Sequence, residues 1–319
     1  MVATKASIEQ RIREVESRLL ARYHVSMVEH RLSLTVEGSP LTVRVLEAGS
    51  GPPVVLLHPG TWFGTMWAPM LPHVSDRRIL CVELPGHGLS GSVDYRRHHA
   101  RDHTVAMLGQ VLSHFGISRV PLVGNSLGGM SALWLAVDDP ERVSQLVIMG
   151  VPAVGIAGGA PDFALSLMSI PVLNRLLLKL PSSPEQSRNL MKGSFGPKAW
   201  AQAPRELFEI HYLAGRRPEF APTVSTLLQT LFRWKTPRPR MTLSDDELAG
   251  IQQPVRFLWG DKDLFGGPEI AERAAALMPD ATVAVHPGGH HLQIDDPERC
   301  GRFLSDALAG ESSATEGAS

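Results

Sequence analysis

Residues 124–129, Gly124-Asn125-Ser126-Leu127-Gly128-Gly129, follow directly after the apolar run Val120-Pro121-Leu122-Val123. The stretch has the G-x-S-x-G form of a nucleophile elbow, in which a sharp turn from strand to helix lifts a serine hydroxyl above a sheet. Glycine is needed at positions 124 and 128 for a steric reason, because a Cβ atom at either position would collide with neighbouring backbone. The apolar run from Met130 to Val137 predicts the helix that such a turn leads into. Ser126 is therefore the candidate nucleophile.

Short, continuous apolar runs on both sides of this turn predict a mostly parallel sheet. Such runs are typical of strands buried on both faces, and the helical segments between them predict crossover helices. The candidate strands are residues 54–57, 79–82, 120–123, 146–149 and 255–259, and the candidate helices are residues 104–115, 127–137 and 268–277. Two alternating runs, at residues 27–36 and 41–46, predict an antiparallel hairpin before them. The expected class is α/β, with helices on both faces of the central sheet.

The segment pattern also predicts how the chain is divided. Residues 25–152 and 252–309 are the two parts of the α/β core. Between them, residues 153–251 are apolar but repeatedly broken by prolines, which predicts a helical lid inserted over the sheet edge. Residues 310–319 are small and polar and predict a disordered tail.

Residues 1–24 form an extension before the core. Their apolar side chains recur at helical spacing with charges between them, which predicts an amphipathic helix. We expect this helix to pack on the body of the protein or on a second subunit. The residues of the apolar stripe are Ile8, Ile12, Val15 and Leu19.

Composition excludes several classes of protein. The 319 residues are 43% hydrophobic, and 31 Lys and Arg nearly balance 32 Asp and Glu, for a net charge of −1. This balance argues against nucleic acid as a partner, because phosphate binding needs a concentrated positive field. No stretch supplies ~20 uncharged apolar residues, so we expect no membrane span. Two cysteines, Cys81 and Cys300, suit a reducing cytoplasm, where we expect the protein to work.

No metal or cofactor site is expected. The histidines at positions 98, 99 and 103 lie together but lack the carboxylate or cysteine cluster of a metal site. The expected partner is a small-molecule substrate.

A serine hydroxyl is a poor nucleophile, so Ser126 needs a base within hydrogen-bond reach and an acid that orients the base. Two segments that follow predicted strands offer these groups: Trp259-Gly260-Asp261-Lys262-Asp263 and His286-Pro287-Gly288-Gly289-His290-His291. The residues alone leave two candidate acids, Asp261 and Asp263, and three candidate bases. Chain order is serine, aspartate, histidine, as in one of the known families of triad enzymes.

These motifs together resemble the α/β-hydrolase fold superfamily, in its lidded form, from about residue 25 to residue 308. Leu57-His58-Pro59-Gly60 is similar to its oxyanion loop, residues 83–90 to its D-x-P-G-x-G-x-S segment, and residues 259–263 to W-G-x-x-D. Gly289-His290, followed by Pro297-Glu298, is similar to G-H-x(6)-P-E. The resemblance implies that Asp263 is the acid and His290 the base, with Asp261 and His291 as alternatives.

The resemblance also implies the oxyanion hole, with one departure. Proline stands where the family has a glycine, and Pro59 has no N–H to donate. The donors implied are the backbone N–H groups of Gly60 and Leu127, with Thr61 as a fallback for Gly60. Thr61, Trp62 and Met66 follow the loop, and we expect them to line the substrate pocket.

A cofactor-independent serine hydrolase is the function that the resemblance implies. We expect it to cleave a small or medium, largely apolar carboxylic ester or related acyl compound through an acyl-enzyme. The motif Gly-Asn-Ser-x-Gly-Gly also resembles C–C bond hydrolases that cleave vinylogous diketones in aromatic degradation, which is the alternative. Less glycine follows His58 here than in those enzymes, which favours an ester. A non-hydrolytic tailoring enzyme, a ligand receptor on the same fold and a homodimer stay open.

Overall fold

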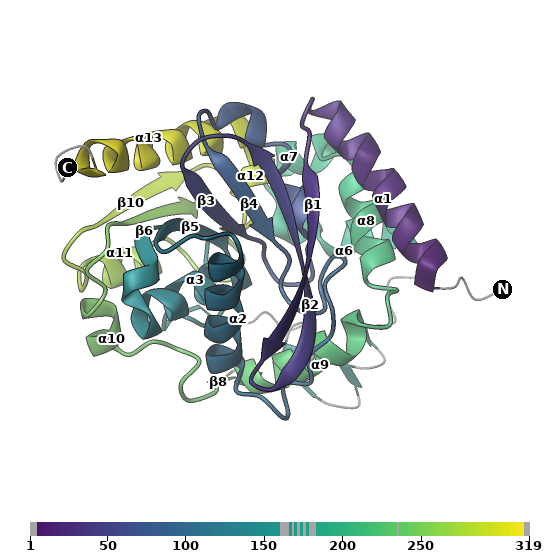
Figure 1. Ribbon diagram of the computed structural model, residues 1–319, viewed down its shortest axis with the longest axis horizontal. Coiled ribbons are helices and arrows are strands. Elements are labelled where there is room, and N and C mark those ends of the chain that lie inside the picture. The colour runs from purple at the N-terminus through teal and green to yellow at the C-terminus, as the bar shows by residue number, and fades with distance from the viewer. Residues whose placement is uncertain are drawn as a thin grey trace.

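The computed structural model describes residues 5–159, 166–167, 169–170, 173–174, 177–178, 183–234 and 236–315. Within these residues, the centre of the molecule is an eight-stranded sheet in the order β1-β2-β4-β3-β5-β6-β9-β10 (Figure 1). The strands are β1 (Val28–Val36), β2 (Ser39–Gly49), β3 (Pro53–Leu57), β4 (Arg78–Val82), β5 (Val120–Asn125), β6 (Val143–Met149), β9 (Val255–Gly260) and β10 (Ala281–His286). β2 is antiparallel to both β1 and β4, and the other neighbours are parallel. The predicted hairpin and mostly parallel sheet are confirmed.

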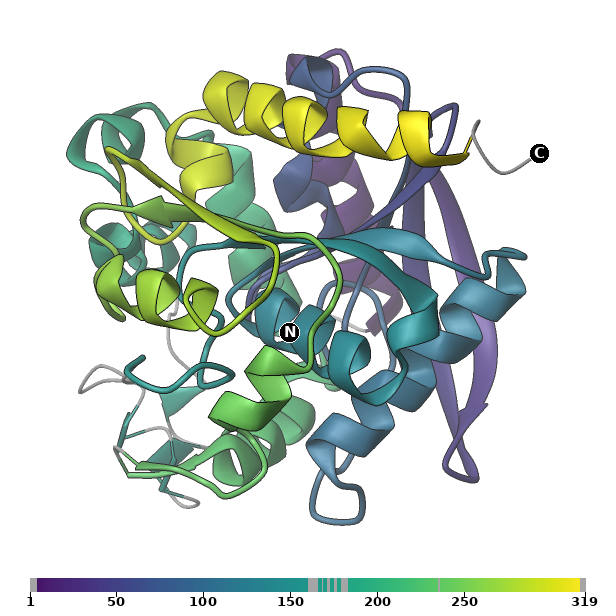
Figure 2. The same ribbon diagram turned by 90° about the vertical axis from the view of Figure 1, so that its left-hand side faces the viewer.

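Helices cover both faces of this sheet, which confirms the predicted α/β class (Figure 2). One face carries α2 (Ala100–His114), α3 (Leu127–Asp138) and α11 (Glu269–Ala275). The other face carries α1 (Lys5–Arg22), the 3₁₀ helix η1 (Gly64–Trp67) and α13 (Pro297–Thr315). Because neighbouring strands from β5 to β10 are parallel, the carboxyl ends of β5, β6, β9 and β10 lie along the same edge of the sheet.

The segment predicted as the lid, between β6 and β9, is largely helical where the structure describes it. It contains α6 (Pro184–Leu190), α7 (Pro197–Gln202), α8 (Arg205–Ala214), α9 (Phe220–Leu231), α10 (Asp245–Ala249), the 3₁₀ helix η4 (Lys192–Ser194) and the short strands β7 (Phe232–Arg233) and β8 (Thr236–Pro237). Residues 160–165, 168, 171–172, 175–176, 179–182 and 235 of this segment lie outside the described residues. The remaining short elements are the 3₁₀ helices η2 (Leu71–His73) and η3 (Pro140–Arg142) and the helix α12 (Leu292–Asp295).

The N-terminal helix α1 lies along α8, a helix of the segment between β6 and β9 (Figure 1). Its apolar residues Ile12 and Leu19 are fully buried in a cluster that includes Leu207 of α8. Ion pairs of 2.8 Å and 2.9 Å join Arg18 to Glu209 and Arg22 to Glu206. The apolar side of α1 is therefore used within the chain and is not free for a second subunit.

The C-terminal tail corrects one prediction. Residues 310–319 were expected to be disordered, but α13 continues through Thr315. Once a helix is nucleated, each further residue adds a hydrogen bond at little cost, and the Ala, Ser and Glu residues here do not stop it. Residues 316–319 lie outside the described residues. Among the described helices, none is both long and apolar enough to span a membrane.

Candidate active site

Ser126 lies in a strained turn between β5 and α3. Its backbone has φ 54° and ψ −115°, a region that side-chain-bearing residues seldom occupy. A Cβ atom at Gly124 would lie 2.4 Å from the backbone of Gly128, and one at Gly128 would lie 2.0 Å from the carbonyl oxygen of Leu57. The steric need for both glycines, predicted from the sequence, is confirmed. The turn leaves Ser126 half-buried, with buried residues on both sides of it.

Asp263 and His290 are paired close to this turn, where Asn125 contacts the backbone of His290. Nδ1 of His290 donates a hydrogen bond of 2.8 Å to Oδ2 of Asp263, and both side chains are almost wholly buried. The same Oδ2 accepts the backbone N–H of Val151 at 2.9 Å, and Oδ1 accepts that of Phe265 at 3.0 Å. The alternative acid, Asp261, is exposed and accepts the N–H of Gly288. The structure therefore brings Asp263, and not Asp261, to His290.

The second ring nitrogen of His290 is not used in this pair. Its Nε2 is buried and has no hydrogen-bond partner in the described part of the chain. No hydrogen bond between this atom and Ser126 Oγ forms here. Such bonds are often long in free enzymes and tighten when substrate binds. The backbone of His290 is fixed from two sides, by the carbonyl of Ser194 at 2.9 Å and by Nδ2 of Asn125 at 3.0 Å.

Asn125, the residue before the candidate nucleophile, organises the histidine segment. Its Nδ2 also donates to the carbonyl of Met149, and its Oδ1 accepts hydrogen bonds from His291 Nδ1 at 3.0 Å and from Gln293 Nε2 at 3.1 Å. His291, the alternative base, is thus buried and bound to an amide rather than to a carboxylate. Burial holds its pKa well below the usual range, so the ring is neutral at pH 7.

Gly150 was not singled out in the sequence. It directly follows β6 with φ +65°, and a Cβ atom there would lie 2.8 Å from Asp263 Oδ2 and 3.2 Å from His290 Nδ1. The absence of a side chain at this position lets the aspartate and the histidine meet. A glycine directly after an apolar strand was the only signal in the sequence.

Gly60 and Leu127 lie side by side at the elbow. A methyl group added to Gly60 would lie 3.8 Å from Leu127 Cβ. Leu127 is the first residue of α3, so its N–H has no partner inside the helix. His58 fixes the loop that carries Gly60: its Nε2 accepts the N–H of Leu84 at 3.0 Å, and its Nδ1 donates to the carbonyl of Pro59 at 2.8 Å. The geometry is compatible with two N–H groups acting on one oxyanion.

The residues predicted to line the pocket differ in their surroundings. Trp62 is buried among rings, 4.9 Å from His291 and 5.6 Å from His211 between ring centroids. Oγ1 of Thr61 forms a 3.2 Å hydrogen bond with Nε2 of His211, a residue of α8 that the sequence did not single out. Met66 is fully buried in the apolar cluster that α1 covers, and its place in the pocket stays a prediction.

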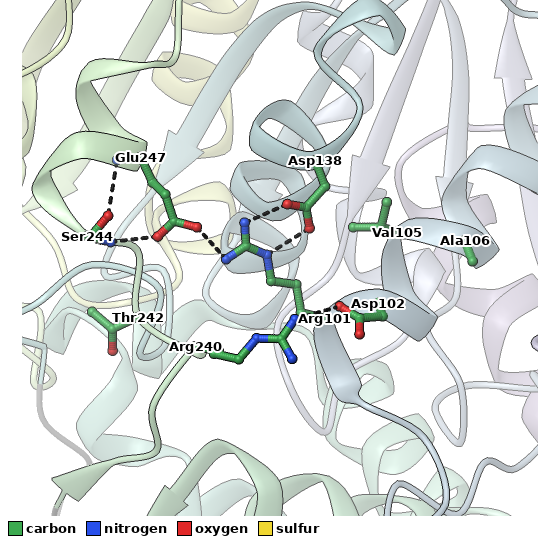
Figure 3. A pocket seen from close by; sticks show the side chains of 9 residues that line it. All are labelled: Arg101, Asp102, Val105, Ala106, Asp138, Arg240, Thr242, Ser244 and Glu247. Carbon is green, nitrogen blue, oxygen red and sulfur yellow. Dashed lines mark hydrogen bonds and ion pairs between the residues drawn. The ribbon is translucent and has the colours of Figure 1, made fainter.

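A separate cavity of about 720 Å³ opens where α2 and α10 approach the end of α3 (Figure 3). Each of its charged side chains has an oppositely charged partner: Arg101 binds Asp138 at 2.6 Å and Glu247 at 2.7 Å, and Arg240 binds Asp102 at 3.4 Å. Its lining includes none of the candidate catalytic residues. Because each of these charged side chains is already in an ion pair, the cavity offers no unpaired charge that would select a ligand.

Sequence comparison places the chain among hydrolases. A family model described as alpha/beta hydrolase fold matches residues 52–297. A 2-hydroxy-6-oxo-2,4-heptadienoate hydrolase from Pseudomonas putida is 28% identical over 274 residues, which are 83% of this chain and 92% of the relative. A 2-hydroxy-6-oxononadienedioate/2-hydroxy-6-oxononatrienedioate hydrolase from Burkholderia vietnamiensis is 28% identical over 287 residues, which are 87% of this chain and 94% of the relative.

Solved structures of two kinds of hydrolase share the fold. The carboxylesterase CesB from Bacillus subtilis superimposes with a TM-score of 0.72 at 19% identity, covering 95% of this chain and 99% of that one. The meta-cleavage product hydrolase CumD from Pseudomonas fluorescens IP01 gives 0.69 at 22% identity, covering 88% and 98%. At these identities the likeness concerns the fold alone and does not distinguish the two activities.

Proposed function

Because the chain belongs to the alpha/beta hydrolase fold family, we propose that it is a serine hydrolase with Ser126 as nucleophile, His290 as base and Asp263 as acid. The observation that carries this proposal is the buried 2.8 Å hydrogen bond between His290 Nδ1 and Asp263 Oδ2. It fixes the proton on Nδ1 and leaves Nε2 to accept the proton of a serine hydroxyl. The strained backbone of Ser126, at the head of α3, supports the same assignment.

The reaction follows from these positions. Ser126 Oγ adds to a carbonyl carbon while His290 Nε2 takes the hydroxyl proton, and the imidazolium is steadied by the carboxylate of Asp263. The N–H groups of Gly60 and Leu127 bind the oxyanion that forms. His290 then gives its proton to the leaving group, and water hydrolyses the acyl-enzyme in a second, equivalent cycle.

For the substrate, we favour a vinylogous 1,5-diketone that is cleaved at a C–C bond. The support is the sequence similarity to the two dienoate hydrolases, which extends over more than four fifths of this chain. A 2-hydroxy-6-oxo-2,4-dienoate becomes such a diketone when the proton of its 2-hydroxyl group moves to C5. The leaving group is then a carbon atom, C5, whose electron pair delocalises along the conjugated chain onto the oxo group at C2. The carbon then takes the proton, and water supplies the hydroxyl of the carboxylic acid released. This preference reverses the ester preference drawn from the glycine content after His58.

An apolar ester is the second candidate. The side chains that contact Thr61 and Trp62 are aromatic rings and imidazoles, and burial lowers the pKa of His211 to about 4. A lining of neutral groups fits an uncharged ester. Free, buried thiols at Cys81 and Cys300 support work in the cytoplasm for either substrate.

The test compares 2-hydroxy-6-oxohepta-2,4-dienoate with p-nitrophenyl butyrate, using wild type, Ser126→Ala and Ser131→Ala. Ser131 is the matched control, because it lies on α3 and its hydroxyl only donates to the carbonyl of Leu127. We expect a higher kcat/KM for the dienoate, abolished by Ser126→Ala and retained by Ser131→Ala.

Each other outcome has a meaning. Turnover of the ester alone would favour the second candidate. Turnover that survives Ser126→Ala would refute the proposed nucleophile. No turnover of either compound by wild type would favour a tailoring enzyme or a receptor.

A further inference from the structure

Thr61 has a backbone conformation that its side chain disfavours. The N–H of Trp62 donates to the carbonyl of Pro59 at 3.2 Å, which closes a turn with Thr61 in its third position. Thr61 has φ +67° there, in the left-handed region that type II turns require and that glycine or asparagine normally supplies. A β-branched residue at positive φ is a genuine outlier. The surrounding structure must therefore hold this threonine in place.

A hydrogen bond between the hydroxyl of Thr61 and the lid holds the residue in this conformation. Thr61 Oγ1 lies 3.2 Å from His211 Nε2, and His211 Nδ1 lies 2.7 Å from Ser187 Oγ. A neutral imidazole donates from one nitrogen and accepts at the other, and a hydroxyl does either, so both hydrogen bonds can form together. Burial lowers the pKa of His211 to about 4, which keeps the ring neutral at pH 7. The three residues come from the loop after β3, from α8 and from α6.

The helix that carries His211 is itself anchored. Two ion pairs tie α8 to α1, and the ring of Trp62 packs edge-on against His211. The same tryptophan packs against His291, the neighbour of the proposed catalytic base. His211 thus connects a fixed lid helix to the loop that carries one proposed oxyanion donor.

We propose that His211 is a positioning residue that sets the oxyanion loop through the hydroxyl of Thr61. The carbonyl of Pro59, which accepts the N–H of Trp62 in this turn, and the N–H of Gly60 belong to the same peptide. The rotation about the N–Cα bond of Thr61 closes the turn and so sets the direction in which the Gly60 N–H points. The lid contact holds that rotation at a strained value, so the oxyanion hole is complete only while α8 is in place. The inference rests on the proposed function, because it assumes that this loop binds the oxyanion.

Four variants test the hydrogen bonds of the two ring nitrogens of His211 separately. His211→Gln can still reach Thr61, because its amide nitrogen lies near the position of Nε2. His211→Asn can reach only Ser187, and His211→Phe keeps the ring but neither hydrogen bond. Thr61→Val removes the hydroxyl at constant shape. His103→Phe is the control. His103 lies on α2 and is also buried, but its ring packs against Tyr95 and not against the loop that carries Gly60.

The expected result is a selective loss of kcat. Removing one oxyanion donor costs about 10²–10³-fold, and misplacing it should cost less, about 10–100-fold. We expect that loss in Thr61→Val, His211→Asn and His211→Phe, with KM changed by less than about threefold. His211→Gln should recover kcat to within about threefold of wild type, and His103→Phe should leave kcat unchanged. The double variant Thr61→Val/His211→Phe should be no slower than its slower parent.

Two readouts keep the tests independent. Urea unfolding of the same double-variant cycle reports the contact without any turnover, and we expect the midpoint shifts to be less than additive. An unchanged kcat in Thr61→Val, or losses in the double variant that multiply, would overturn the role of His211 while Ser126→Ala stays inactive. Failure of the proposed function would instead appear as turnover in Ser126→Ala, with the urea result unchanged.

Discussion

Gly150→Ala should reduce turnover by disturbing the pair of Asp263 and His290. The new methyl group would lie 2.8 Å from Asp263 Oδ2, closer than carbon and oxygen approach without one of them moving. Asp263 is buried and held by two backbone N–H groups, so it must shift by several tenths of an ångström together with His290. Since a 1 Å misplacement can cost 10²-fold, we expect kcat to fall by about tenfold, or about 1.4 kcal/mol in activation free energy.

Gly116→Ala is the matched control for this change. Gly116 has φ +67°, against +65° for Gly150, but a Cβ atom there would meet nothing within 4 Å. Both alanines carry the same backbone strain, about 1 kcal/mol of unfolding free energy. The assay is kcat on whichever substrate wild type turns over, with urea unfolding of each variant. Equal kcat in the two variants would refute the steric account of Gly150.

Three further predictions concern the acid, a buried ion pair and pH. Asp263→Asn should lower kcat by about 10³–10⁴-fold, because the pair that fixes the histidine tautomer is lost, whereas Asp261→Asn keeps its acceptor oxygen and should stay within about twofold. The reverse order in steady-state kinetics would identify Asp261 as the acid. Glu16→Gln should lower the unfolding free energy by about 2–3 kcal/mol in urea, because it breaks a buried, bidentate contact with Arg44, while the exposed Glu14→Gln should change it by less than about 0.5 kcal/mol. Equal effects would contradict the ion-pair account. Burial lowers the pKa of His87 to about 3, so below pH 6.5 the unfolded chain binds a proton that the folded chain does not. Stability should therefore fall as the pH drops from 6.5 toward 3, by about 2 kcal/mol at pH 5 from this residue, and His87→Gln should fall less steeply; identical pH profiles would contradict this cause.

The elbow and the sheet were predictable because their signals are local. The G-x-S-x-G pattern marks the turn within five residues, although the backbone that requires glycine at position 128 is that of Leu57 in β3. The apolar runs report burial on both faces. The same runs predicted the strands of the core with errors of one to a few residues at their ends.

The parts that sequence reasoning missed depend on distant contacts. His211 meets Thr61 across 150 residues, and Val151 meets Asp263 across 112. A residue whose partner lies this far away in the sequence leaves no local sequence pattern by which it could be recognised. The amphipathic pattern of α1 likewise predicted a helix but not the surface on which the helix packs. The partners of Arg18 and Arg22 in α8 lie 191 and 184 residues away in the sequence.

The choice of substrate was beyond the motifs for a similar reason. The motif around Ser126 predicts a reaction class, acyl transfer, whereas the substrate depends on residues elsewhere in the chain that bind the leaving group. The ester preference rested on the glycine content of one loop. In our proposal, similarity to C–C bond hydrolases over most of the chain outweighs that single feature.

Covalent labelling of Ser126 tests the central claim most directly. A fluorophosphonate reacts with a serine only when a neighbouring base activates it. After incubation with the reagent, intact-protein mass spectrometry and peptide mapping should show one adduct per chain, on Ser126, in wild type and in Ser131→Ala. Ser126→Ala should show none. An adduct on another serine, or an unmodified wild type, would contradict the assignment of Ser126 as the nucleophile.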